Sequence, residues 1–81
     1  MWTVYIVRCA DNSLYTGIAK NIDERIESHN AGRGAKYTRS RRPVELAYSE
    51  AADDRATALR REFAIKRLER DAKKKLIESW R

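Results

Sequence analysis

The sequence predicts a small α+β fold, in which a three-stranded antiparallel sheet is flanked by helices in the order β-β-α-β-α-α. Three observations favour this fold class. Two short runs rich in β-branched and aromatic residues open the chain, a third run with alternating apolar and polar residues lies in its middle, and helical patterns follow the second and third runs. Because a chain of 81 residues buries only about 60% of its unfolded surface, we expect residues 1–81 to form a single domain.

The first two strands are expected over Thr3–Cys9 and Leu14–Ile18, joined by a tight turn. The residues between them hydrogen-bond readily to their own backbone and accept turn dihedrals. Each strand carries one tyrosine, Tyr5 or Tyr15. Side chains alternate between the two faces along a strand. The two rings therefore share a face only if the sequence numbers of the two residues in each cross-strand pair sum to an even number. A loop of Asp11–Ser13 gives such a register, and we predict it.

A helix follows the hairpin, from Asn21 to Gly32. Asn21 and Glu24 form a capping box, and Gly32 supplies a left-handed stop. The apolar stripe of this helix consists of Ile22 and Ile26. Arg25 and His29 lie four residues apart beside that stripe, so two polar side chains project near its buried edge.

The segment from residue 33 to residue 43 has neither a helical nor a strand period and is strongly basic. We predict an exposed loop here that contacts nucleic-acid phosphates and stacks one base. The residues expected to do so are Lys36, Tyr37, Arg39, Arg41 and Arg42. The alternative is a merely solvated loop. Pro43 fixes the exit of the loop, and Val44–Ser49 then alternates apolar and polar residues as a third strand does.

Two helices are predicted in the last third of the chain, the first from about Asp53 and the second capped by Asp71. The apolar stripe expected to face the core in the first consists of Ala56, Leu59 and Phe63. Glu62 lies just off that stripe. The residues expected to close over the core from the last helix are Leu76, Ile77 and Trp80.

The formal net charge of +6 favours a polyanionic partner, and we expect nucleic acid, DNA in particular. Binding to an anionic membrane would need a basic amphipathic helix with a free apolar face, which the pattern does not offer. The single cysteine, Cys9, allows no intrachain disulfide and fits a reducing compartment. The chain has no apolar run of about 20 residues and opens directly into a strand, so we expect a cytoplasmic protein.

The polar residues singled out so far also have ordinary structural interpretations. Strand tyrosines such as Tyr5 and Tyr15 commonly pack with the hydroxyl at an edge. Arg25 could be a solvated helix residue, and His29 could stabilise a helix end. Glu62 could pair with a basic neighbour on its own helix.

Taken together, in this order and spacing, these residues resemble the GIY-YIG nuclease superfamily over nearly the whole chain. Several segments are similar in particular to its small stand-alone UPF0213 or YhbQ-like branch, which in turn resembles the catalytic domain of certain structure-selective endonucleases. These segments are Tyr15–Gly17, His29–Gly32, Gly34–Thr38, Arg41–Val44 and Leu59–Glu62.

The resemblance implies a role for each matched position. Tyr5 would be the general base or would position the attacking water, and Tyr15 would hydrogen-bond at the same site. Arg25 would hold the scissile phosphate, for which a fork of donors suits better than a lysine. His29 would assist near the water or the tyrosine. Glu62 would be the sole protein ligand of one Mg²⁺ or Mn²⁺, a cation that keeps several waters and contacts the phosphate.

The chemistry of these residue types agrees with such a site, because a tyrosine with a pKa near 10 needs a metal or nearby cations to act at neutral pH. Gly17, expected at the end of the second strand, would let the chain turn into the helix without crowding the phosphate. Many family members place an asparagine after the metal-binding glutamate, whereas this chain has no asparagine beyond Asn30.

The resulting hypothesis is a metal-dependent endonuclease that hydrolyses DNA phosphodiester bonds, with structure-selective action in repair or recombination. The alternative is a non-catalytic nucleic-acid-binding module on the same scaffold. A third hypothesis is an adaptor that works through protein contacts. A cleavage assay with a divalent metal separates the first two.

Overall fold

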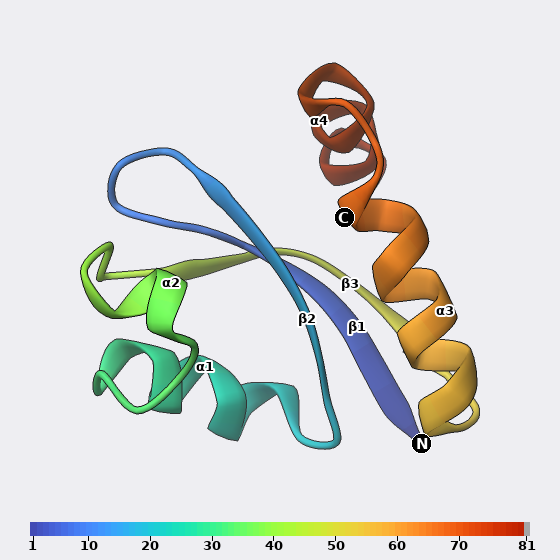
Figure 1. The fold of residues 1–81 in the computed structure, drawn as a ribbon, viewed down its shortest axis with the longest axis horizontal. Coiled ribbons are helices and arrows are strands. Elements are labelled where there is room, and N and C mark those ends of the chain that lie inside the picture. Colours follow the sequence, from blue (N-terminus) through green and yellow to red (C-terminus); the bar gives the residue numbers. More distant parts are fainter. Residues whose placement is uncertain (81) are drawn as a thin grey trace.

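A computed structural model describes residues 1–80 and has the predicted α+β architecture (Figure 1). The central strand of the sheet is β1, and both neighbours pair with it antiparallel, in the order β2-β1-β3. The strands are β1 (Trp2–Arg8), β2 (Leu14–Ala19) and β3 (Glu45–Ala52). The helices are α1 (Ile22–Asn30), α2 (Lys36–Arg39), α3 (Arg55–Lys66) and α4 (Arg70–Glu78).

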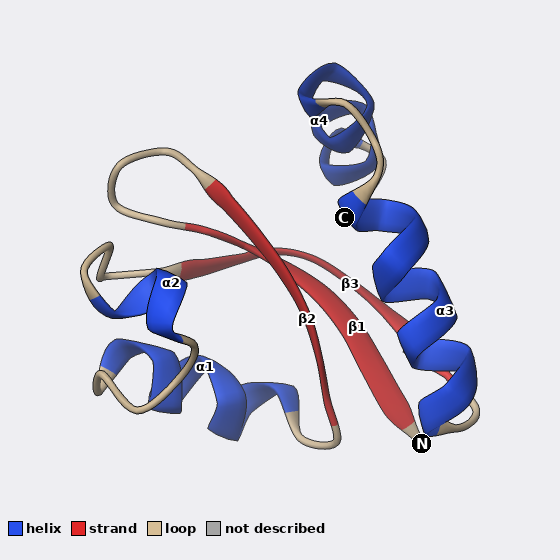
Figure 2. Cartoon of the chain, viewed as in Figure 1, coloured by secondary structure: helices blue, strands red, loops and turns tan. Residues whose placement is uncertain are grey.

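Helices cover both faces of the twisted sheet (Figure 2): α1 and α2 lie on one side, and α3 and α4 lie on the other. Under α3 and α4 the core contains Val4, Ile6, Tyr48, Ala52, Ala58 and Ile65. Leu76 and Ile77 of α4 and Trp80, just after it, were expected to close over this core, and all three pack against it. The opposite face buries Tyr5, Val7, Cys9, Ala19 and Val44 against the apolar stripe of α1. The two faces of β1 therefore serve two separate layers of packing.

The hairpin register places Tyr5 opposite Gly17 and Tyr15 opposite Val7, so the two tyrosines share a face as predicted. The predicted loop was wrong by one residue. The backbone N–H of Cys9 donates to the carbonyl of Ser13 at 2.8 Å, which leaves residues 10–12 in the turn. The side chain of residue 11 causes this shift, because its Oδ1 accepts hydrogen bonds from both N–H and Oγ of Ser13.

Caps decide where the helices begin and end. Asn21 Oδ1 accepts from the N–H of Glu24 at 3.1 Å, and Gly32 has the predicted left-handed backbone, with φ at +81°. Asp54 caps α3 in the same way. The predicted cap of the last helix was wrong, because Glu69 occupies the N-cap position and Asp71 lies in the first turn, where its charge favours the helix dipole.

The predicted core stripe of α3 was also wrong. Leu59 and Phe63 are 36% and 62% exposed, Ala56 is exposed too, and the buried residues of this helix are Ala58 and Ile65. The packed side of α3 also carries two charged residues, Arg61 and Glu62. Arg61 donates to Glu50 on β3 at 2.8 Å, which allows a charged residue to sit against the sheet.

The basic segment is not wholly a loop, since residues 36–39 form the one-turn helix α2. The third strand runs from Glu45 to Ala52, three residues beyond the predicted end. Across the described residues 1–80, no helix is both long and apolar enough to cross a membrane.

Candidate active site

The phenol of Tyr5 extends across Gly17 toward the outer edge of the sheet. Tyr5 is fully buried, and a Cβ atom added to Gly17 would lie 2.6 Å from its Oη. Gly17 is in the middle of β2 and does not end it, so the predicted role in turning the chain was wrong. The missing side chain instead makes room for the ring of Tyr5. Because β2 is an edge strand, side chains from both helical layers can reach this phenol.

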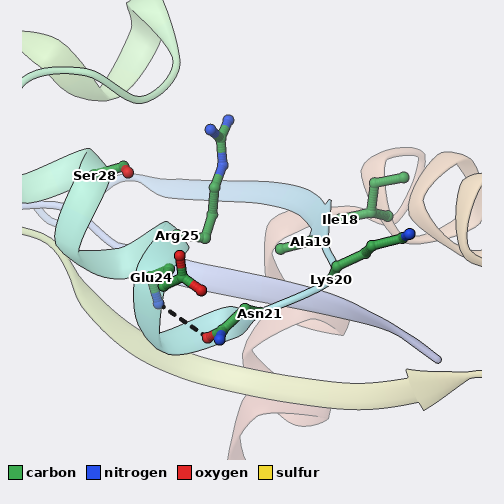
Figure 3. Close-up of a pocket in the computed structure, with 7 residues that line it drawn as sticks. All are labelled: Ile18, Ala19, Lys20, Asn21, Glu24, Arg25 and Ser28. Carbon is green, nitrogen blue, oxygen red and sulfur yellow. Dashed lines mark hydrogen bonds between the residues drawn. The ribbon is translucent and has the colours of Figure 1, made fainter.

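Two α1 side chains hydrogen-bond to Tyr5. Its Oη lies 2.9 Å from Nε2 of His29, and Nε of Arg25 donates to the same Oη at 3.3 Å. The two residues are four apart in α1 and therefore lie on the same side of the helix. Figure 3 shows the Arg25 side chain standing away from the helix beside an open pocket, with its terminal nitrogens directed away from the other labelled residues. Arg25 thus fixes Tyr5 through Nε and presents the end of its guanidinium outward.

Burial dominates the protonation of this pair. It raises the pKa of Tyr5 above its ordinary value of 10.0, an effect that Arg25 opposes and that Tyr15 and Glu62 reinforce. Burial also lowers the pKa of His29, and the positive charge of Arg25 lowers it further. At neutral pH the pair is therefore a neutral phenol beside a neutral imidazole.

Tyr15 joins the site through ring contacts. Its ring packs edge-on against the ring of His29, with the ring centres 5.6 Å apart. It also stacks on the ring of Tyr37, with the ring centres 5.9 Å apart. Nζ of Lys66, on α3, lies 6.0 Å above the same ring. Tyr15 therefore links α1, α2 and α3 at the edge of the sheet.

Glu62 approaches from α3, on the other layer. Its side chain is only 18% exposed, and Nζ of Lys66 lies 3.4 Å from its carboxylate. The negative charge of Glu62 adds a small contribution to the raised pKa of Tyr5.

The donor set suits a metal that the substrate helps to hold. No group of three or more acidic, histidine or cysteine side chains able to bind a metal occurs within residues 1–80. Mg²⁺ does not need such a group, because it is commonly bound by one or two carboxylates together with phosphates and waters. The partly accessible carboxylate of Glu62 fits that requirement once Lys66, which is 50% exposed, moves aside.

The basic segment borders the site, but its cations differ in how firmly they are held. Arg41 donates to Asp11 and to the carbonyl of Tyr37, and it lies 3.9 Å above the Tyr37 ring. Arg42 donates to the carbonyls of Arg39 and Asn30. By contrast, the residues that lie exposed on α2 include Lys36 and Arg39. Tyr37 is 40% exposed, although its ring already contacts Tyr15 and Arg41.

Sequence reasoning missed two residues that support the site. Thr38 is fully buried, and its Oγ1 lies 2.8 Å from Nδ1 of His29. Gly34 leaves room for the imidazole, since a Cβ at this position would lie 2.8 Å from Cγ of His29. Both belong to a segment that resembled the UPF0213 branch, which was the one signal in the sequence that pointed to them.

Comparison with known proteins decides the family. The family model of the GIY-YIG catalytic domain matches residues 1–76. The chain belongs to the GIY-YIG family. It is 56% identical over 75 residues to a UPF0213 protein of Staphylococcus haemolyticus, covering 93% of this chain and 92% of that one. A UPF0213 protein of Staphylococcus saprophyticus is 57% identical over 74 residues, covering 91% and 90% of the two chains.

A solved structure of a UPF0213 protein has a similar fold. The solution NMR structure of a UPF0213 protein from Bacillus halodurans is 42% identical, with a TM-score of 0.61, and the match covers 96% of this chain and 84% of that one. Membership in the GIY-YIG family places the chain among nucleases, which act on nucleic acid and generally use divalent metals. The names of the UPF0213 relatives state no specific activity.

Proposed function

We propose that this GIY-YIG protein is an Mg²⁺- or Mn²⁺-dependent endonuclease that hydrolyses DNA phosphodiester bonds by direct attack of water. One observation carries the proposal. A buried tyrosine, Tyr5, is hydrogen-bonded to both His29 and Arg25, and the carboxylate of Glu62 pairs with Lys66, whose Nζ lies 6.0 Å from the centre of the adjoining Tyr15 ring. A proton acceptor, a phosphate-binding cation and a metal-binding carboxylate are the parts that phosphodiester hydrolysis requires.

Tyr5 is proposed as the general base. As water attacks phosphorus, Oη of Tyr5 accepts a proton from the water and passes its own proton to Nε2 of His29, 2.9 Å away. The new bond joins the water oxygen to phosphorus, and the bond from phosphorus to the leaving sugar oxygen breaks. That oxygen takes a proton from solvent. The relay avoids a free phenolate, which the raised pKa of Tyr5 disfavours.

Arg25 and Glu62 are proposed to manage the negative charge. The outer nitrogens of Arg25 bind the scissile phosphate while its Nε stays on Tyr5, so the phosphate and the base share one support. Glu62 would hold the divalent cation. When bound, that ion stabilises charge on the phosphate and lowers the pKa of its waters. Tyr15 borders the same space and orients His29 by ring contact.

The proposed substrate is DNA, bound by shape and backbone, because the chain is basic and residues 1–80 include no helix presented for reading the major groove. The cations proposed to contact the strand are those beside the site, Lys36, Arg39, Arg41 and Arg42, with Tyr37 among them. Such binding suits branched or damaged DNA, as in repair or recombination. The single buried Cys9 fits a reducing compartment, so we propose a cytoplasmic enzyme.

A cleavage assay tests this function. Wild-type protein and Glu62→Gln are incubated with duplex, single-stranded and branched DNA in Mg²⁺ or Mn²⁺. We expect cleavage by the wild type and a loss of at least about 100-fold in the variant, because the metal loses its protein ligand. Glu27→Gln, which changes an exposed carboxylate on α1, is the matched control and retains activity. Equal rates for wild type and Glu62→Gln would place the activity elsewhere.

A second candidate is a non-catalytic nucleic-acid-binding module. The observation in its favour is the ion pair of Glu62 with Lys66, which occupies the carboxylate proposed to bind the metal. This candidate predicts binding that weakens steeply with added salt and no cleavage of any DNA with either metal.

A further inference from the structure

A buried threonine holds the far side of the His29 ring. Thr38 is fully buried, and its Oγ1 lies 2.8 Å from Nδ1 of His29. The same Oγ1 lies 3.0 Å from the backbone carbonyl of Ala35. Since a carbonyl oxygen can only accept, the hydroxyl proton of Thr38 is the one that makes this second bond.

The direction of that bond fixes the tautomer of His29. With its proton on the Ala35 carbonyl, Oγ1 of Thr38 can only accept from the imidazole, so Nδ1 carries the hydrogen. A neutral imidazole has one N–H, and therefore Nε2 is an acceptor. The hydroxyl of Tyr5 lies 2.9 Å from this Nε2 and donates to it.

The hydrogen bonds of Tyr5 agree with this tautomer. Its Oη already accepts from Nε of Arg25, which is always a donor. Among residues 1–80, Oη has one further partner, Nε2 of His29. In the opposite tautomer Nε2 would also donate, and the buried phenol would keep a proton with no protein acceptor. Such an unsatisfied buried donor is unfavourable.

We propose that Thr38 is a positioning residue, which holds His29 in the tautomer that can take the proton of Tyr5. This inference rests on the proposed function, in which Tyr5 is the base. It extends the hydrogen-bonded chain behind the base, in the order Tyr5, His29, Thr38, with the carbonyl of Ala35 at its end.

The arrangement serves both charge states of the imidazole without movement. After Nε2 receives the proton, it donates back to Oη of Tyr5, while Nδ1 continues to donate to Thr38. The imidazole of His29 is also held sterically, because the backbone of Gly34 lies so close to the ring that no side chain fits between Gly34 and His29. Preorganised hydrogen bonds of this kind avoid reorganisation during reaction. The segment that carries the basic residues thus also orients His29, the residue that takes the proton from Tyr5.

The tautomer can be observed directly, since the chain contains one histidine. Nitrogen NMR shifts of the isotope-labelled imidazole at neutral pH are compared in wild type, Thr38→Val and Thr38→Ser, without metal or DNA. We expect the Nδ1–H form in wild type and Thr38→Ser, and loss of that preference in Thr38→Val, which keeps the shape but has no hydroxyl. An Nε2–H form in the wild type would overturn the proposal, even if Thr38→Val failed to fold.

Cleavage rates then connect the tautomer to function. Thr38→Val is expected to lower the cleavage rate by about 10- to 100-fold with little change in DNA binding, as outer partners of functional histidines do, and Thr38→Ser to restore most of it. A folded Thr38→Val with wild-type tautomer and rate would overturn the proposal. Absence of cleavage by the wild type would contradict the proposed function alone, because the NMR comparison needs no activity.

Discussion

At the scale of single residues, the proposed base depends on an atom that is missing from the neighbouring strand. The phenol of Tyr5 occupies the space that a Cβ on Gly17 would fill. A small residue in the middle of an edge strand is costly for strand stability, and here it is explained by the ring that crosses it.

Gly17→Ala is therefore expected to destabilise the fold by about 1–3 kcal/mol and to displace Tyr5 Oη from His29. Urea unfolding measures the first effect, and the cleavage assay measures the second. In a Tyr5→Phe background the added methyl group no longer meets Oη, although Cζ remains 2.8 Å from it. The penalty should then shrink by at least about 0.5 kcal/mol. Additive penalties would contradict the steric explanation.

The buried His29 predicts a specific dependence of stability on pH. Burial lowers its pKa in the folded state below the unfolded value of about 6.5, so the unfolded chain binds the proton first. The contribution of neutral His29 to the free energy of unfolding is therefore fully present above about pH 6.5. It is lost as the pH drops through the folded-state pKa. NMR titration of the single histidine, with urea unfolding at each pH, checks this. A folded-state pKa at or above 6.5 would refute it.

At the scale of elements, α3 shows where hydrophobic periodicity predicts a helix correctly but not the face that it buries. The apolar repeat that ends in Phe63 predicted a buried stripe, but the packed side of the helix carries Ala58, Glu62 and Ile65. The apolar repeat failed as a guide because Arg61 pairs with Glu50 of the sheet and Glu62 pairs with Lys66, and hydrophobic periodicity does not take such ion pairs into account.

Two substitutions on α3 distinguish the two stripes. Ile65→Ala is expected to cost about 2–5 kcal/mol, because the side chain is fully buried. Phe63→Ala should cost less than about 1 kcal/mol, since the ring is 62% exposed. Urea unfolding of both variants gives the comparison. A larger loss for Phe63→Ala than for Ile65→Ala would show that the helix packs by the other face.

Features that depend on neighbours in sequence were predictable. The cap at Asn21, the left-handed Gly32 and the shared face of Tyr5 and Tyr15 follow from local chemistry and strand alternation, and all three are confirmed. The support of His29 by Thr38 was not predictable, because it requires the one-turn helix α2 to fold back onto α1. The candidate site was thus visible in its main residues, while its supporting contacts were not.

At the scale of the whole molecule, the net charge of the chain is +6, of which the candidate site carries only a small part. Arg25 and Lys66 contribute positive charge there, and Glu62 contributes negative charge. Substrate binding should therefore be governed by the cations outside the site, and above all by those on α2, which contacts the site through Tyr37.

Salt dependence distinguishes these cations. Lys36→Ala is expected to weaken DNA binding and to reduce the slope of log affinity against log salt concentration by about one, the effect of one lost phosphate contact. Lys75→Ala, at an exposed position on α4, is the matched control and should leave the slope unchanged. Equal effects from the two variants would indicate non-specific attraction over the whole surface.

The most direct test of the proposed chemistry is the single-turnover cleavage rate of Tyr5→Phe with branched or duplex DNA and Mg²⁺ or Mn²⁺. This variant keeps the buried ring and removes only the oxygen that bonds to His29 and Arg25. We expect cleavage by the wild type and a loss of at least about 100-fold in the variant, with DNA binding retained. Cleavage by Tyr5→Phe at the wild-type rate would contradict it.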